Sequence, residues 1–110
     1  MTKDWRPHAE HVLDAIRKIR RIQARGRISD DEVLYDAALR NLQTLAESTQ
    51  HLPDDRKAAC PDVPWRRISG FRNILVHGDL GSIDPAAVED VIARHLDVLE
   101  QRVAAMLRES

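Results

Sequence analysis

The chain is poor in cysteine, in aromatic residues and in long apolar runs. Its one cysteine, Cys60, cannot form a disulfide within the chain, and this favours a reducing compartment such as the cytoplasm. No apolar run approaches the ~20 residues that a membrane span requires, and the first residues lack the apolar segment of a secretion signal. We therefore expect a cytoplasmic location and no contact with a membrane.

The sequence also lacks an excess of charge of either sign, because its 17 basic and 18 acidic residues give a net charge of −1. This balance excludes a protein that coats nucleic acid through bulk positive charge, so any such contact must use a local patch. Only four glycines and five prolines are present, which excludes collagen-like and low-complexity classes. With 110 residues, 43% of them hydrophobic, the chain 1–110 is expected to form a single domain with one core.

Apolar residues recur at helical spacing along most of the chain. Main helices are predicted at about residues 6–25, 29–51, 64–77 and from 85 onwards, with a short helical turn at 54–60 in a proline-containing connector. No segment alternates polar and apolar residues over the length of a strand. The sequence therefore predicts an all-α antiparallel bundle of four main helices plus a short connector helix.

Capping residues mark the ends of these helices. Asp4 is the expected N-cap of the first helix, and Gly26 is expected to end it. Ser29 and Glu32 have the spacing of a capping box at the start of the second helix. Asp84 followed by Pro85 is a typical start for the last helix.

The end of the first helix is strongly basic. Two interpretations are open: a solvated face that complements the helix dipole, and a phosphate-binding surface. The residues concerned are Arg17, Lys18, Arg20, Arg21, Arg25 and Arg27.

Arg72 and His77 are the main candidates for chemistry. Four residues separate them, which places them about 140° apart on an ideal helix. They can therefore share a cleft only near a helix end, where Gly78 allows the chain to turn. Spacing alone favours a simpler interpretation, with a surface salt bridge at Arg72 and a helix cap at His77.

An arginine and a histidine suit cleavage of RNA without a metal. Histidine titrates near neutral pH, so it can take a proton from a ribose 2′-hydroxyl or give one to the leaving 5′-oxygen. Arginine remains cationic and offers a planar set of donors to a doubly charged phosphorane. We expect no metal and no cofactor.

The segment around these residues resembles the HepT-like branch of the HEPN superfamily, a group of minimal toxin ribonucleases. The matching residues are Pro64, Trp65, Arg66, Ile68, Gly70, Arg72, Asn73, His77 and Gly78. Residues 36–48 are similar to the second helix of that family, with Arg40 and Glu47 in the expected places. The resemblance covers about the whole chain.

The resemblance implies a HEPN-type helical bundle that forms a homodimer, with the two motifs facing one cleft. It implies a metal-independent endoribonuclease toxin of a type VII-like pair, with a nucleotidyltransferase as antitoxin and RNA as substrate. Arg72 would stabilise the phosphate and the transition state, and His77 would be the general base or acid. Asn73 would support one of them or the substrate, while Arg66 and Arg67 would draw in RNA.

Asp79 departs from the family pattern, because the family has a tyrosine there that the antitoxin modifies with AMP. The only tyrosine of the chain is Tyr35. The carboxylate of Asp79 has three possible roles: repelling RNA phosphate, pairing with Arg72, or orienting His77. The alternative function is a catalytically silent HEPN dimer that serves a nucleotidyltransferase as scaffold or regulatory subunit.

Other polar residues give weaker signals. His8, His11 and Asp14 follow each other at one-turn spacing but lack a recognised zinc motif. Arg40 and Glu47 are expected to form a buried or interfacial polar pair. Single residues are interpreted as follows: His51 is an exposed helix-end residue, His95 is a satisfied core or interface histidine, Trp65 is a packing anchor rather than a base-stacking residue, and Cys60 is not catalytic.

Overall fold

The structure is a computed structural model that describes residues 4–76 and 85–109, apart from the side chains of residues 73–76 and 87. These ranges contain helices and connecting turns, and no strand. The elements are α1 (Arg6–Arg25), a 3₁₀ turn η1 (Ile28–Asp30), α2 (Glu32–Thr49), α3 (Asp54–Ala58), α4 (Trp65–Val76) and α5 (Pro85–Arg108). The all-α prediction and the short connector helix are therefore confirmed.

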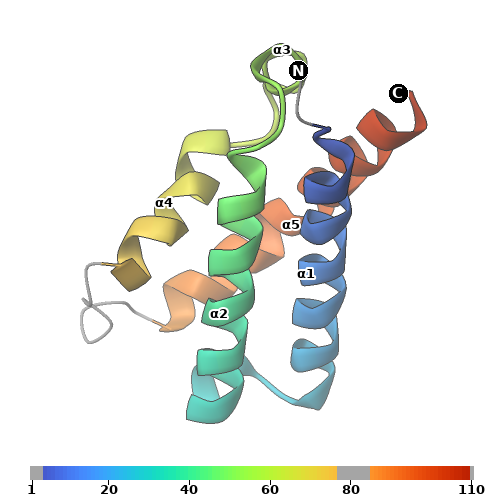
Figure 1. Cartoon of the computed structure of the whole chain (residues 1–110). Helices are drawn as coiled ribbons and strands as arrows, with labels where there is room; N and C mark the ends of the chain where they lie inside the picture. The colour runs from blue at the N-terminus through green and yellow to red at the C-terminus, as the bar shows by residue number, and fades with distance from the viewer. Residues whose placement is uncertain (1–3, 77–84, 110) are drawn as a thin grey trace.

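The helices form two layers (Figure 1). α1 and α2 are antiparallel neighbours, and α4 lies beside α2 on the side away from α1. α5 runs diagonally behind α1 and α2 rather than alongside them, and it packs against α1. The outer face of the α1–α2 pair is thereby left without a covering helix within the described part of the chain.

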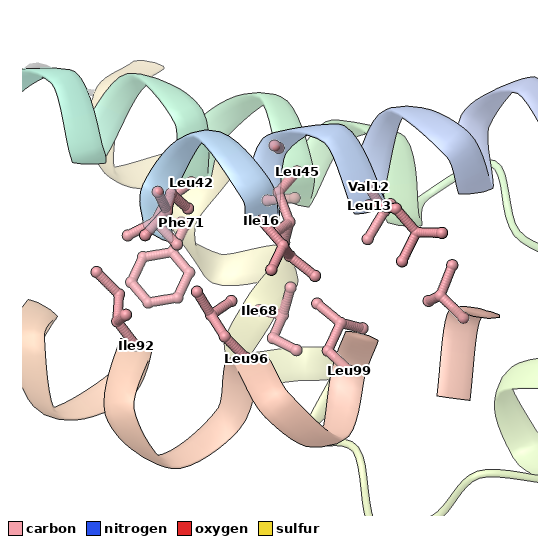
Figure 2. Close-up of a cluster of buried hydrophobic side chains, with 14 of the residues drawn as sticks. Val12, Leu13, Ile16, Leu42, Leu45, Ile68, Phe71, Ile92, Leu96 and Leu99 are labelled. Carbon is pink, nitrogen blue, oxygen red and sulfur yellow. The ribbon is translucent and has the colours of Figure 1, made fainter. Parts of the chain in front are cut away.

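One continuous core fills the space between the layers. Figure 2 shows side chains from four helices meeting in this core. Its members are aliphatic apart from Phe71 and Met106 and include Val12, Ile16, Leu42, Leu45, Ile68, Ile92, Leu96 and Leu99. Phe71 on α4 is 8% exposed and directly precedes Arg72, so core packing fixes the backbone that carries the candidate site.

Two of the predicted helix caps are wrong. The capping carboxylate of α2 belongs to Asp31, which accepts hydrogen bonds from the backbone N–H groups of Val33 and Leu34. Ser29 lies in η1 and donates to Oε2 of Glu89 on α5, 2.7 Å away. At the start of α1 the N-cap position is held by Trp5, without a side-chain cap.

Asp4 and Gly26 lie at the two ends of α1. Asp4 lies one residue before the observed N-cap position, and its carboxylate accepts a hydrogen bond from the backbone N–H of Arg6, 3.1 Å away. Gly26 ends α1 as predicted, with a φ of 154° that side-chain-bearing residues rarely adopt. The predictions on Gly78 and Asp84 fall outside the described residues.

Trp65 acts as the packing anchor that the sequence predicted. Its indole Nε1–H donates to the carbonyl oxygens of Lys57 and Cys60, at 3.0 and 3.1 Å. The half-buried ring also packs against the core. The connector that contains α3 is thereby tied to the first residue of α4.

A second tie joins the connector to α5. Arg102 donates through Nε and Nη2 to the carboxylate of Asp62, with the shortest distance at 2.6 Å. These hydrogen bonds, followed by the charge of Arg102, hold the pKa of Asp62 below its usual range. Because the pKa is lower in the folded state, the pair stabilises the fold above the unfolded pKa of about 4 and loses this effect as the pH falls further.

We therefore expect that Arg102→Gln raises the pKa of Asp62 toward its ordinary value. NMR titration of the side-chain carboxyl carbon measures this pKa directly. In the variant, stability should also depend less on pH in the acid range. An unchanged Asp62 titration in Arg102→Gln would contradict the assignment of the shift to this pair.

None of the helices in the described ranges is long and apolar enough to cross a membrane.

Candidate active site

Arg72 lies on α4 and forms an ion pair with Glu47 on α2. Its Nη1 is 3.5 Å from Oε2 of Glu47, and the two side chains are 39% and 55% exposed. At this exposure an ion pair is worth about 0–1 kcal/mol. The guanidinium is therefore held in position but can exchange its carboxylate partner for another anion at little cost.

A second polar contact lies one helical turn away from this pair. Gln50, three residues after Glu47, donates from Nε2 to Oγ of Ser69 at 2.7 Å, and Ser69 precedes Arg72 by three residues. Ser69 in turn donates to the carbonyl oxygen of Trp65. Two contacts at matching spacing fix the rotation of α4 against α2, so that Arg72 points along the seam between them.

The remaining predicted site residues divide into two groups. Arg66 and Arg67 are exposed in the first turn of α4 and line a separate surface pocket of about 500 Å³ with the connector, a pocket that Arg72 does not line. The side chain of Asn73, and His77 and Asp79 altogether, lie outside the described residues. The structure thus places Arg72 and leaves the predicted Arg72–His77 arrangement as a prediction.

The predicted pair of Arg40 and Glu47 is wrong. Both side chains are exposed, and Glu47 pairs with Arg72 instead. Seven residues on one helix separate Cα atoms by about 10.5 Å along the axis, which is too far for a strong ion pair. Sequence reasoning noted Glu47 but missed its role, because its partner lies on another helix.

The histidines at the end of the α1–α2 pair do not form a metal site with Asp14. His8 stacks on the ring of His51, with centroids 4.0 Å apart and an angle of 17° between the ring planes. The centroid of His11 is 6.1 Å from that of His8, in an edge-on arrangement. Within residues 4–76 and 85–109, no three histidine, cysteine or acidic residues are arranged to hold a metal ion.

His51 is exposed just beyond the end of α2, as predicted.

His95 was predicted to be a core or interface histidine with its hydrogen bonds satisfied, and the first of these alternatives is wrong. It is half-buried on α5, and its buried Nε2 finds no hydrogen-bond partner among the described residues. The alternative prediction of an interface histidine stays a prediction.

Cys60 has the properties of a packing residue. It is half-buried against the core, and burial raises the pKa of its thiol. A raised pKa keeps the sulfur protonated at neutral pH, so it is a poor nucleophile.

The basic end of α1 is partly neutralised. Arg20 pairs with Asp97 and Glu100 on α5, and Lys18 pairs with Asp14. Arg21 and Arg25 are exposed and have no ion-pair partner among the described residues. The basic end therefore contains both a structural contact and free positive charge.

Comparison with known proteins gives one consistent result. A family model described as ribonuclease HepT-like matches residues 10–106. "Putative RNase TTE0752" of Caldanaerobacter subterraneus is 28% identical over 110 residues, which cover 96% of each chain.

Two archaeal proteins show the same likeness over shorter stretches. "Probable ribonuclease HepT" of Thermococcus cleftensis is 26% identical over 74% of this chain and 76% of its own length. "Putative RNase MJ0127" of Methanocaldococcus jannaschii is 30% identical over 72% of this chain and 68% of its own length. No solved structure matches the chain.

Proposed function

Because this chain belongs to the ribonuclease HepT-like family and its relatives are named putative or probable ribonucleases, we propose that it is a metal-independent endoribonuclease that acts as the toxin of a toxin–antitoxin pair. The observation that carries the proposal is the half-exposed Arg72 held at the seam of α2 and α4. This guanidinium is fixed in direction, open to solvent and weakly paired. These are the properties that a phosphate-binding group requires.

In the proposed reaction the 2′-hydroxyl of a ribose attacks the adjacent phosphorus. His77 removes the hydroxyl proton, and the imidazolium that results donates a proton to the 5′-oxygen as the P–O5′ bond breaks, which leaves a 2′,3′-cyclic phosphate. Arg72 exchanges Glu47 for the phosphate and stabilises the doubly charged phosphorane. Asn73 supports the histidine or the substrate, and Arg66 and Arg67 attract RNA at the start of the same helix.

The proposed active form is a homodimer in which the motifs of two subunits face one cleft. A single arginine and histidine provide half of such a composite site. The proposed partner that neutralises it is a nucleotidyltransferase antitoxin encoded nearby. Both parts of this proposal rest on what the resemblance of residues 64–78 to the HepT-like branch implies.

The test is cleavage of RNA by the purified chain in the presence of EDTA. The proposed groups are ionic and acid–base groups, so cleavage should be unaffected by the chelator. Light scattering on the same sample should give the mass of a dimer at micromolar concentration. Activity that EDTA abolishes and Mg²⁺ or Mn²⁺ restores would contradict the mechanism, and a purely monomeric mass would contradict the composite site.

One observation favours the alternative of a silent scaffold: Arg72 is already paired with a carboxylate. Expression of the chain without its partner separates the two functions. A toxin should arrest growth, and the His77→Ala variant should not. If the protein is a silent scaffold, neither the wild type nor the variant should arrest growth.

Asp79 should change how the protein is neutralised. An AMP group on a carboxylate would form a mixed anhydride, which hydrolyses readily, so a partner nucleotidyltransferase should leave Asp79 unmodified. We expect the intact mass of the co-expressed wild-type chain to be unchanged, and Asp79→Tyr to become a substrate. A stable gain of AMP on the wild-type chain would contradict this expectation.

A further inference from the structure

A groove runs along the outer face of the α1–α2 pair, away from Arg72. Its floor is aliphatic and its rim is basic. The cavity has a volume of about 410 Å³ and is lined by Lys18, Arg21, Ile22, Arg25, Val33, Leu34, Ala37 and Asn41. We propose that this groove binds an acidic amphipathic segment of another protein.

The apolar part of the groove is unusually accessible. Val33 is 74% exposed, and it is the only large hydrophobic side chain in the described residues that is exposed. Ile22, Leu34 and Ala37 are half-buried beside it and present further apolar surface. Leaving such a side chain in water gains nothing for folding, whereas covering it with a partner removes apolar area from water.

The charge of the groove identifies the partner. Three cations line it, and no carboxylate does. Arg21 and Arg25 are exposed and lack an ion-pair partner in the described part of the chain, while Lys18 is paired with Asp14 outside this lining. The chain as a whole has a net charge of −1, so this concentration of positive charge is local. It complements carboxylates that flank an apolar side chain.

The side chains on the floor favour a protein over RNA. Single-stranded RNA is bound without sequence preference by stacking its bases on aromatic side chains beside a basic track. No residue that lines this groove is aromatic. Aliphatic side chains instead fit leucine-like side chains of an amphipathic helix, which insert at i, i+3 and i+7 positions.

The groove continues along the same face. An adjoining cavity of about 460 Å³ shares Lys18 and Asn41 with it and is also lined by His11, Asp14, Arg40 and Thr44. The second cavity adds another cation, Arg40, on the α2 side, and the carboxylate of Asp14, which is paired with Lys18. The two cavities together provide a track along the seam of two helices, which suits a helical segment rather than a small molecule.

NMR chemical-shift mapping on the 110-residue chain tests the proposal. The probe is a short helical peptide with leucines at i, i+3 and i+7 and glutamates between them. Binding should have a Kd of about 10–100 µM, as expected for a generic rather than a native ligand. The shifts should concentrate at Ile22, Val33, Leu34 and Ala37. Peptides with glutamine in place of glutamate, or with alanine in place of leucine, should bind at least about tenfold more weakly.

Charge-reversal variants localise the contact. Arg21→Glu and Arg25→Glu should each weaken binding of the glutamate peptide by about tenfold or more. The matched control is Arg17→Glu, on the same helix and exposed but outside the lining of both cavities, which should change the affinity less than about threefold. All these side chains are on the surface, and circular dichroism checks that each variant is folded.

Three results would overturn the proposal. The first is shifts that are absent or scattered over other faces. The second is an oligouridine probe that shifts the signals of the groove residues and binds with a lower Kd than the peptide, which would make this an RNA surface. The third is a lower mass of Val33→Asp by light scattering than of the wild type, which would show that a second copy of the chain occupies the groove.

Discussion

Replacement of Arg72 with alanine should reduce the rate of RNA cleavage about 10²–10³-fold, which is the usual cost of removing one donor from a preorganised transition-state site. The effect should appear mainly in kcat, because the phosphorane carries more negative charge than the ground-state phosphate. The variant should remain folded. Its side chain is 39% exposed, and surface changes of this kind alter the free energy of unfolding by about 0.5 kcal/mol.

The control for this prediction is Arg94→Ala. Arg94 is 70% exposed on α5 and pairs with Asp90, so its removal deletes the same charge and a similar ion pair at another place. Initial rates on one RNA substrate, with thermal unfolding of each variant, provide the comparison. A folded Arg72→Ala protein with the wild-type kcat would contradict the role assigned to the guanidinium.

Glu47→Gln provides the reciprocal measurement. If Arg72 must leave Glu47 to bind phosphate, neutralising Glu47 should lower KM for RNA, by up to about fivefold for an ion pair worth at most ~1 kcal/mol. The value of kcat should be unchanged. Asp36→Asn is the matched control, because Asp36 is an exposed carboxylate on the same helix and has no ion pair within the described residues.

Replacement of Phe71 with alanine should lower the free energy of unfolding by about 3–5 kcal/mol. Phe71 is 8% exposed, and its ring packs in the core among Leu42, Ile92 and Leu96 (Figure 2). Removing it leaves a cavity where helices from both layers meet. For a small domain with a total stability of about 5–15 kcal/mol, this loss is large.

Denaturant unfolding followed by circular dichroism measures the effect. Phe71→Leu should cost less, because it restores part of the volume. Val33→Ala, at a side chain that is 74% exposed, should change the free energy by about 0.5 kcal/mol or less and serves as the control. A Phe71→Ala protein as stable as the control would contradict the packing described for α4.

The helices were predictable from the sequence where local signals agree. α1 spans Arg6–Arg25 as predicted, because a regular apolar stripe ends at a glycine whose φ of 154° few other residues tolerate. The turn at Asp54–Ala58 was also predicted within the connector. Both features depend on residues that are close together in the chain.

The failures share a physical cause, which is contact between distant residues. Serine is a common capping residue, but the hydroxyl of Ser29 donates its hydrogen bond to Glu89, sixty positions later in the chain. Glu47 was assigned a partner on its own helix, whereas its actual partner lies on α4. The Nε2 of His95, which has no hydrogen-bond partner within residues 4–76 and 85–109, and the groove between α1 and α2 likewise depend on how helices pack. Periodicity identifies the face of a helix but not the residue opposite it.

The diagonal course of α5 has a consequence for the order of folding. α1 and α2 are joined by a short connection and can associate early, whereas the contact of Arg20 with Asp97 closes a loop of 77 residues. Closing a long loop costs entropy before its contacts compensate for it, so such contacts form late. During synthesis one side of the core stays uncovered until the residues of α5 have left the ribosome. We expect the nascent protein to lack the proposed ribonuclease activity until α5 has docked.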